Sequence, residues 1–375
     1  MLTFRLLDDA GDAAVQLIAE TEQALIDDMA RRIGRLDGVT PATNWQALRL
    51  ELLGTEQERI VRELARTLNT TEQRIIELFD EAATRTLDAD NRLFRAAGYD
   101  PVPLAENAYL QQIIRSGLIK TQEEYQNLTL TTANTATRQF ERALDLAYHE
   151  IISGGYTYQQ AIRDGIRVLT NNGIASIEYP TGHVDYAGVA FRRATLTGIN
   201  QTAAEIQLAN MEQMGTDLVE TTAHPGARPT HAVWQGRVFS VSGTSTKYPS
   251  FREVTGYGTG PGLCGWNCRH SFFPYFEELS DPAYSADKLR EYNNKMVTFN
   301  NETMSLYDAT QQQRYIERQI RRWKREASAL DSAGQDNSAA KAKIREWQAR
   351  QRDFIEQTDL RRDYFRERAG AQLIK

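Results

Sequence analysis

The sequence contains little cysteine: two thiols, Cys264 and Cys268, in 375 residues. So few thiols exclude the disulfide framework that holds small secreted domains together. Long apolar runs are missing too, since no stretch approaches the roughly 20 apolar residues of a membrane-spanning helix. The N-terminal segment meets two acidic residues directly after a short apolar patch, which is not the pattern of a secretory signal. We therefore expect a protein that is made in a cytoplasm and has no membrane contact there.

A strong excess of charge of one sign is also absent. The formal net charge is −6 at pH 7, and this mildly acidic balance argues against a surface that binds nucleic acid throughout. The charge is uneven, because residues 307–375 carry a net +5 and the remainder a net −11. The C-terminal region is therefore the one segment for which we consider contact with DNA.

The basic residues of this region allow two interpretations. The first group along the chain consists of Arg314, Arg318, Arg321, Arg322, Lys324 and Arg325. These side chains can contact phosphates, with Trp323 stacking on a base. Alternatively, they form a solvated helix face while Trp323 and Trp347 bury the inner side. The interspersed acids Glu317 and Glu326 favour the second interpretation.

Helical periodicity dominates most of the sequence. Apolar residues recur every three or four positions, as they do on one face of a helix. The pattern predicts helices over residues 12–36, 45–68, 105–116, 121–126, 132–152, 157–169, 188–213, 306–329 and 339–368. Capping boxes at Thr70–Gln73 and Thr157–Gln160 each indicate the start of a helix. The first of these implies that a helix ends at Asn69.

The expected fold is mainly α. It comprises a helical N-terminal body, a small irregular α+β module rich in Cys, His and Gly, and a C-terminal antiparallel helical hairpin. The composition places the boundaries at a helical N-terminal region 1–100, a central helical domain 101–215, the module 216–283, and the hairpin 284–375. Two long helices joined by a short polar loop are typical of a hairpin.

The module carries the densest group of chemically active side chains. Its composition shifts to Gly, Pro, Thr, Ser and aromatic residues without a helical period, and short strands are predicted near 218–219, 238–241 and 272–273. The glycine-rich stretch 256–262 lacks the Gly-Lys-Ser/Thr ending of a phosphate-binding loop. These glycines more readily serve positive φ angles and close backbone approach.

A zinc site is the most specific chemical interpretation of the module. The candidate ligands are His231, Cys264, Cys268 and His270, with His224 as an alternative to His231. Thiolate and imidazole are the ligands that tetrahedral zinc prefers. The Cys-x₃-Cys-x-His spacing is not that of a standard finger. No other cofactor is indicated.

Two other interpretations of the same residues remain open. Cys268 can act as a nucleophile with His231 or His270 as its base, which describes a metal- or thiol-dependent hydrolase. Neither an oxyanion hole nor an orienting third group is visible in the sequence, so no catalytic residue is predicted. In the simplest interpretation the cysteines are small buried apolar residues, and the histidines donate to loop carbonyls.

These segments together resemble one known family, the minor capsid protein 2 family of tailed phages. The matching pieces are HPGARPTHAVWQG (224–236), GYGTGPGLCGWNCRH (256–270) and SFFP (271–274). Further segments similar to the family are QNLTLTT (126–132), SGGYTYQQAIRDGI (153–166), DYAGVAFRRATLTGINQT (185–202) and QQQRYIERQIRRWKR (311–325), and the helical first third is a looser match. The Asn267-Cys268-Arg269 triplet is also similar to the end of the motif in Mu F-type head morphogenesis proteins.

The resemblance implies a minor structural protein of a phage head, not an enzyme. It implies location in the virion, inside the head or at the portal vertex, after synthesis in the bacterial host cytoplasm. The implied partners are the portal protein and other head proteins, with a role in head assembly, DNA packaging or DNA delivery. The residues expected to hold the module together are His224, Arg228, His231, Trp234, Asn267, Cys268, Arg269 and His270.

Overall fold

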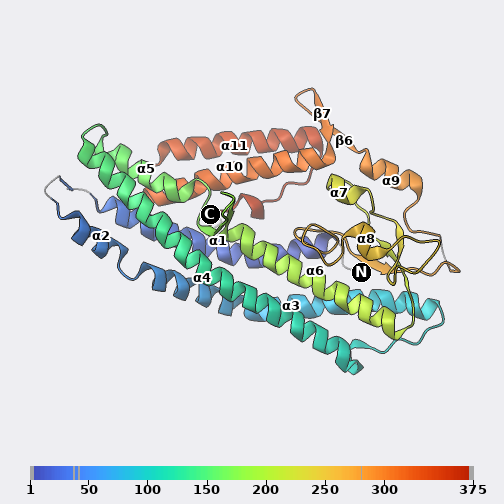
Figure 1. The fold of residues 1–375 in the computed structure, drawn as a ribbon. Helices are drawn as coiled ribbons and strands as arrows, with labels where there is room; N and C mark the ends of the chain where they lie inside the picture. The colour runs from blue at the N-terminus through green and yellow to red at the C-terminus, as the bar shows by residue number, and fades with distance from the viewer. Residues whose placement is uncertain (1–3, 37–38, 41–42, 280, 371–375) are drawn as a thin grey trace. The chain divides into compact units, whose positions relative to one another are not determined.

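The structure, a computed structural model, describes residues 4–36, 39–40, 43–279 and 281–370 and is mainly α, as predicted (Figure 1). The longer helices are α1 (Phe4–Gly34), α2 (Trp45–Leu53), α3 (Glu56–Ala96), α4 (Ala108–Ser153), α5 (Tyr158–Thr170), α6 (Ala187–Gln213), α10 (Leu306–Ser332) and α11 (Ser338–Thr358). Shorter helical segments are η1 (Leu104–Glu106), α7 (Pro229–Ala232), α8 (Phe251–Thr255), α9 (Ala286–Asn293) and η2 (Phe365–Glu367). None of the helices described combines the length and the apolar character needed to cross a membrane.

The strands form small antiparallel sheets. One pairs β1 (Ala175–Glu178) with β2 (Val184–Tyr186), and another pairs β6 (Met296–Phe299) with β7 (Glu302–Ser305). The third has the order β4-β3-β5 and comprises β3 (Leu218–Thr221), β4 (Val238–Ser240) and β5 (Phe272–Pro274). In this sheet Val219 lies opposite Phe239 on one side and Pro274 on the other.

The chain forms two compact units, each assembled from segments that are distant in the sequence. The module unit contains the segment up to Asp12 together with Glu72–Glu124 and Arg193–Gln311, and the hairpin unit contains Ala13–Thr71, Tyr125–Arg192 and the chain from Gln312 onward. Helices α1, α3, α4, α6 and α10 contribute residues to both units. The four regions defined by composition stay a prediction.

The hairpin unit is held by a buried apolar core. Its members come from α1, α2, α3, α4, α5, α10 and α11, including Met29, Phe140 and Ile166, all fully buried. The predicted capping box at Thr157 is present: its hydroxyl accepts from the Gln160 backbone amide, and the Gln160 side chain accepts from the Thr157 backbone amide. This cap fixes the start of α5 and thereby the face that α5 buries.

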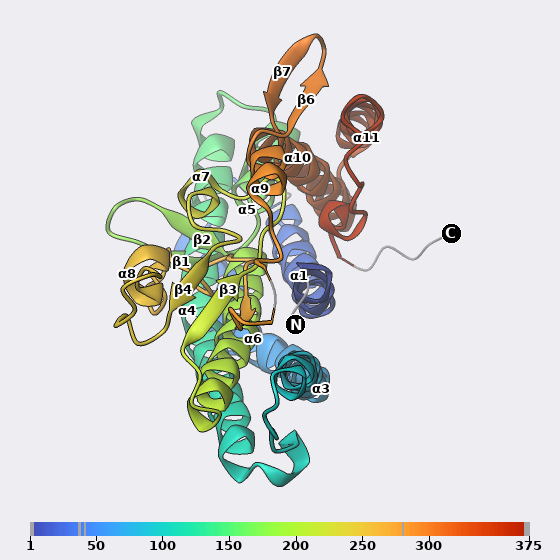
Figure 2. The same ribbon diagram turned by 90° about the vertical axis from the view of Figure 1, so that its right-hand side faces the viewer.

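The predicted C-terminal hairpin is confirmed. Helices α10 and α11 lie side by side in both views (Figures 1 and 2), and the Tyr315 and Trp347 rings meet edge to face with centroids 5.7 Å apart. Trp323 packs against the core of the hairpin unit. The second helix ends earlier than predicted, at Thr358 instead of residue 368, because Asp359 adopts the left-handed conformation with φ 55°.

The basic residues of α10 divide by burial. Arg325 is buried, donates to the Thr170 carbonyl oxygen at 3.3 Å and lies 3.6 Å from Glu22. Arg318 is exposed, with its guanidinium 5.9 Å from the centre of the Tyr315 ring. Part of this basic cluster therefore stabilises the hairpin unit itself.

Three predicted interruptions of helices are wrong. Helix α3 continues through Asn69 because the Thr70 hydroxyl, predicted to cap a new helix, donates to the Arg66 carbonyl oxygen at 2.8 Å. Residues 105–152 form one helix from Ala108 instead of three, and the hydroxyls of Thr129 and Thr137 donate to carbonyl oxygens four residues earlier, each at 2.8 Å. Such bonds satisfy the hydroxyl group of a threonine within a helix.

The core of the module unit joins helices to the three-stranded sheet. Buried apolar residues from α3 and α6 pack with Val219, Phe239 and Phe272 of the sheet, and Trp234, Phe251 and both cysteines belong to the same cluster. The predicted strands near 218–219, 238–241 and 272–273 are thus present as β3, β4 and β5. These strands, with the short helices α7 and α8, form the irregular α+β module that the sequence predicts beside α6 (Figure 2).

Candidate functional site

The short helix α7 positions the first ligand candidate. Arg228 is extended, and Pro229 occupies the first turn of α7, where its missing N–H costs no hydrogen bond. The turn continues beyond α7, since the backbone amides of Trp234 and Gln235 donate to the His231 carbonyl oxygen. Spacings of three and four residues put His231, Trp234 and Gln235 on one side, and all three are buried.

The glycine-rich loop after α8 positions the second group. Gly256 and Gly258 have positive φ, as expected, and so do Cys264 (58°) and Asn267 (54°). A Cβ atom on Gly262 would lie 2.0 Å from the Gly256 carbonyl oxygen. The loop therefore folds back on itself at a distance that only glycine permits. It delivers Cys264, Cys268 and His270 into the interior.

Three of the predicted ligands converge in the module. The Nδ1 atoms of His231 and His270 are 3.4 Å apart, and Cys268 Sγ lies 3.7 Å from the first and 3.9 Å from the second. The exposed fractions of the three side chains are 2, 2 and 6% for His231, His270 and Cys268. Within the part of the chain that the structure describes, these residues form one group able to hold a metal ion.

The outer nitrogen of each histidine ring has a defined partner. His231 Nε2 lies 2.9 Å from the Pro261 carbonyl oxygen, and His270 Nε2 lies 3.0 Å from Gln235 Oε1. Burial lowers the pKa of both imidazoles and raises the pKa of the Cys268 thiol. At neutral pH the site thus holds two neutral imidazoles.

Cys264 occupies a different position from the other candidate ligands. It is buried, its Sγ lies 3.8 Å from the His270 carbonyl oxygen, and it lies outside the converging group. Burial raises the pKa of its thiol well above the ordinary value. His224, the alternative ligand, stacks on the His270 ring with centroids 4.4 Å apart, and its Nδ1 lies 3.0 Å from the Pro225 carbonyl oxygen.

The other residues expected to hold the module lie around this group. Trp234 is buried with its ring centre 4.6 Å from that of His231 and 4.9 Å from that of His270. The Arg228 guanidinium donates to the Trp266 carbonyl oxygen at 2.8 Å. Asn267 is exposed and supplies a left-handed turn directly before Cys268, while Arg269 is half-buried.

Polar residues of α6 contact the module and were missed as site residues. The Asn200 amide donates to the carbonyl oxygens of Cys268 and His270, each at 3.3 Å. Gln207 donates to the Phe272 carbonyl oxygen at 2.6 Å and to the Asp90 carboxylate at 2.8 Å. Both side chains are buried. Amide side chains on a helix face that is otherwise apolar were the available signal, and Asn200 lies in the segment 185–202 that resembles the family.

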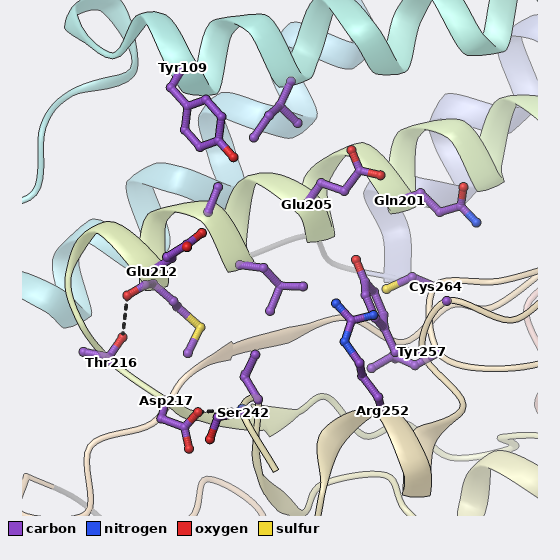
Figure 3. A pocket seen from close by; sticks show the side chains of 17 residues that line it. Tyr109, Gln201, Glu205, Glu212, Thr216, Asp217, Ser242, Arg252, Tyr257 and Cys264 are labelled. Atoms are coloured by element: carbon purple, nitrogen blue, oxygen red, sulfur yellow. Dashed lines mark hydrogen bonds between the residues drawn. The ribbon is translucent and has the colours of Figure 1, made fainter. Parts of the chain in front are cut away.

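A pocket of 780 Å³ lies within the module unit (Figure 3). Tyr109 from α4 and Glu205 from α6 face it from one side, and Arg252, Tyr257 and Cys264 face it from the other. The Arg252 guanidinium lies 5.2 Å from the centre of the Tyr257 ring, and burial raises the pKa of Tyr257. Cys264 lines this pocket, whereas Cys268, His231 and His270 are not among its lining residues.

Comparison with known proteins places this architecture in a family. Residues 2–356 match the family described as phage minor capsid protein 2. A structural protein of Lactococcus phage LL-H is 29% identical over 253 residues, which cover 64% of this chain and 65% of that protein. A structural protein of Lactococcus phage mv4 is 34% identical over 125 residues, which cover 32% of this chain and 92% of that protein.

The matches differ in how much of each protein they cover. The aligned part spans slightly less than two thirds of the LL-H protein. No solved structure matches the fold. The family match, in contrast, covers nearly the whole chain and includes the module and nearly all of the hairpin helices α10 and α11. The chain therefore belongs to the phage minor capsid protein 2 family and is a structural phage protein.

Proposed function

We propose that this protein is a minor component of the phage head that associates with the portal and acts in head assembly and in DNA packaging or delivery. The observation that carries the proposal is the family match over residues 2–356. The structure is compatible with such a role, because most of the chain forms long helices with few irregular segments. A helical scaffold with one compact module suits a protein that contacts other head proteins.

We propose further that the module has no catalytic activity. Cys268, the residue expected to be the nucleophile of a hydrolase, is 6% exposed. Burial raises the pKa of its thiol, so the reactive thiolate is disfavoured. The pocket of the module unit is lined by Cys264 and not by Cys268. A substrate in this pocket would therefore not meet the Cys268–histidine group.

The C-terminal hairpin is the part that we assign to contact with packaged DNA. Helix α11 exposes Lys341, Arg345 and Arg352, which follow each other at spacings of four and seven residues. Such spacings put the three charges on one face of the helix. A row of cations on one helix face is complementary to the negative charge of a phosphate backbone. The contribution of α10 is smaller, because Arg325 is buried.

The test is to quantify the chain in purified particles. DNA-filled phage and DNA-free proheads are separated on a density gradient, treated with a lysine-reactive cross-linker and analysed by mass spectrometry. We expect the chain in both fractions, at far fewer copies than the major capsid protein, with cross-links to the portal. Absence from both fractions would remove the head assignment, and presence without portal cross-links would remove the portal assignment.

A further inference from the structure

The hydrogen-bond partners of the two buried histidines fix their tautomers. The Pro261 carbonyl oxygen can only accept, so His231 Nε2, 2.9 Å away, carries the proton. Gln235 Oε1 receives the His224 backbone N–H at 3.0 Å, and the Gln235 amide nitrogen donates to Asn293 Oδ1 at 2.7 Å. The Gln235 amide orientation is thereby fixed, and His270 Nε2 must also carry its proton.

Two lone pairs consequently face each other in the interior. With both Nε2 atoms protonated, each neutral ring presents an unprotonated Nδ1, and these nitrogens are 3.4 Å apart. Two acceptors cannot hydrogen-bond to each other. The Cys268 thiol has one proton, which can serve one of the two nitrogens and not both. Buried polar atoms normally have partners, so the group needs a further electron-pair acceptor.

The spacing of the three atoms matches a metal coordination sphere. Tetrahedral zinc with about 2.0–2.1 Å to nitrogen and about 2.3 Å to sulfur separates two nitrogens by about 3.3–3.4 Å and nitrogen from sulfur by about 3.5–3.6 Å. The distances here are 3.4 Å between the nitrogens and 3.7 and 3.9 Å to the sulfur. The nitrogen pair already fits, and each nitrogen–sulfur distance is within about 0.4 Å of the value for such a sphere.

The surroundings are also those of a metal site. Histidine ligands commonly donate their second ring N–H to a carbonyl or carboxylate, which orients the ring. Pro261 and Gln235 supply such acceptors to His231 and His270. The two neutral imidazoles need not lose a proton before they bind a metal. One thiolate with two imidazoles is a donor set suited to zinc.

We propose that the module binds one zinc ion through His231 Nδ1, His270 Nδ1 and the Cys268 thiolate. The ion ties α7 to the chain that leads into β5, across the 36 residues between His231 and Cys268. Cys264 stays outside the coordination sphere, which differs from the four-ligand set expected from the sequence. Binding transfers the Cys268 thiol proton to solvent, and no redox change is involved.

The test measures metal content with a matched pair of cysteine variants. The full-length chain is produced in zinc-supplemented medium, dialysed against metal-free buffer and analysed by elemental mass spectrometry. We expect about one zinc per chain in the wild type and in Cys264→Ser, and at least a tenfold loss in Cys268→Ser. Equal loss from both cysteine variants would overturn the three-ligand assignment.

A second measurement does not depend on a variant that folds. Metal-free wild-type protein is titrated with Co²⁺, and visible spectra are recorded together with a thermal unfolding curve. Thiolate coordination in a tetrahedral site gives an intense absorption between sulfur and cobalt, and binding to the folded state raises the unfolding temperature. Absence of zinc from the purified wild type, together with a flat cobalt titration, would overturn the proposal.

Discussion

The side-chain amide of Asn200 on α6 donates to the backbone carbonyl oxygen of His270 at 3.3 Å. The same amide nitrogen lies 3.3 Å from the Cys268 carbonyl oxygen, so one helix residue holds both ends of the Cys268–His270 segment. Asn200 is 1% exposed. A buried donor with two carbonyl acceptors is a strong determinant of local structure, because its loss removes an amide donor from both carbonyl oxygens.

Asn200→Asp should destabilise the protein by about 1–3 kcal/mol or more. The substitution keeps the shape of the side chain but replaces the donor by a carboxylate oxygen that faces two carbonyl oxygens. Urea unfolding followed by circular dichroism measures the loss. The control is Gln201→Glu, which makes the same chemical change at an exposed neighbouring position. Equal stability of the two variants would remove Asn200 from the support of the module.

Asp90 should make stability depend on pH between about 4 and 7. Burial raises its pKa to about 7, well above the roughly 3.9 of an unfolded Asp. The neutral carboxylic acid thus favours the folded state: this stability is fully present below about pH 4 and is lost as the pH rises through about 7. Asp90→Asn should therefore unfold at a higher temperature than wild type at pH 7.5, with a smaller difference at pH 4. Exposed Asp88→Asn is the control, and parallel pH profiles for wild type and Asp90→Asn would contradict the assignment.

Gln235 should tune zinc affinity without contacting the metal. Its Oε1 accepts from His270 Nε2 and fixes the ring orientation, so Gln235→Leu should weaken zinc binding by about 10–100-fold. Gln235→Glu retains an oxygen acceptor and should recover most of the affinity. Competition with a chromophoric zinc chelator gives the dissociation constants. If the Gln235→Leu and Gln235→Glu variants bind zinc equally well, Gln235 does not position His270.

Gly262→Ala should disrupt the module. The added Cβ would lie 2.0 Å from the Gly256 carbonyl oxygen and 2.4 Å from its carbonyl carbon. Backbone atoms cannot move aside as a flexible side chain does, so the cost should reach or exceed the about 1–3 kcal/mol of ordinary overpacking. Thermal unfolding checks this expectation. Gly188→Ala in α6 is the matched control, since nothing lies within 4 Å of its Cβ, and it should be neutral or stabilise by about 0.5–1 kcal/mol.

The exposed cations of α11 should account for any DNA affinity of the chain. Replacing Lys341, Arg345 and Arg352 by Ala should reduce the slope of log affinity against log salt by up to about 0.9 for each phosphate that is no longer neutralised. Fluorescence anisotropy with duplex DNA at several salt concentrations gives the slope. The control removes Arg62, Arg66 and Arg74, which are exposed on α3. An equal reduction of this slope in both triple variants would show that the attraction to DNA is not specific to α11.

The sequence predicted the existence of the elements better than their ends. The cap at Thr157 was recognised because its Gln160 partner lies in the same short stretch. The same pattern at Thr70 led to the wrong prediction of a new helix, since a threonine hydroxyl can also donate to the carbonyl oxygen of the preceding turn. The short local pattern does not show which bond forms; in the structure α3 runs on and buries Leu64 before this point and Ile75 after it.

For the candidate site, the sequence predicted which residues take part but not how their side chains are arranged. His231, Cys268 and His270 were recognised from their density in one window, and they do converge. The separation of Cys264 from this group follows from its left-handed backbone, which depends on the path of the whole glycine loop. The contacts of Asn200 and Gln207 required knowledge of how α6 packs against the module, and residue spacing alone does not contain that information.

The close approach of Gly262 to Gly256 also bears on how this protein can evolve. A mutation at position 262 is tolerated only if the backbone at 256 is rerouted in the same lineage, so position 262 cannot change alone. Buried apolar positions of the helices are less restricted, since one apolar residue can replace another at modest cost. Descendants of a common ancestor should therefore retain the spacing of these glycines long after their helical segments have become unrecognisable. This spacing is then a more durable marker of common descent than the apolar pattern of the helices.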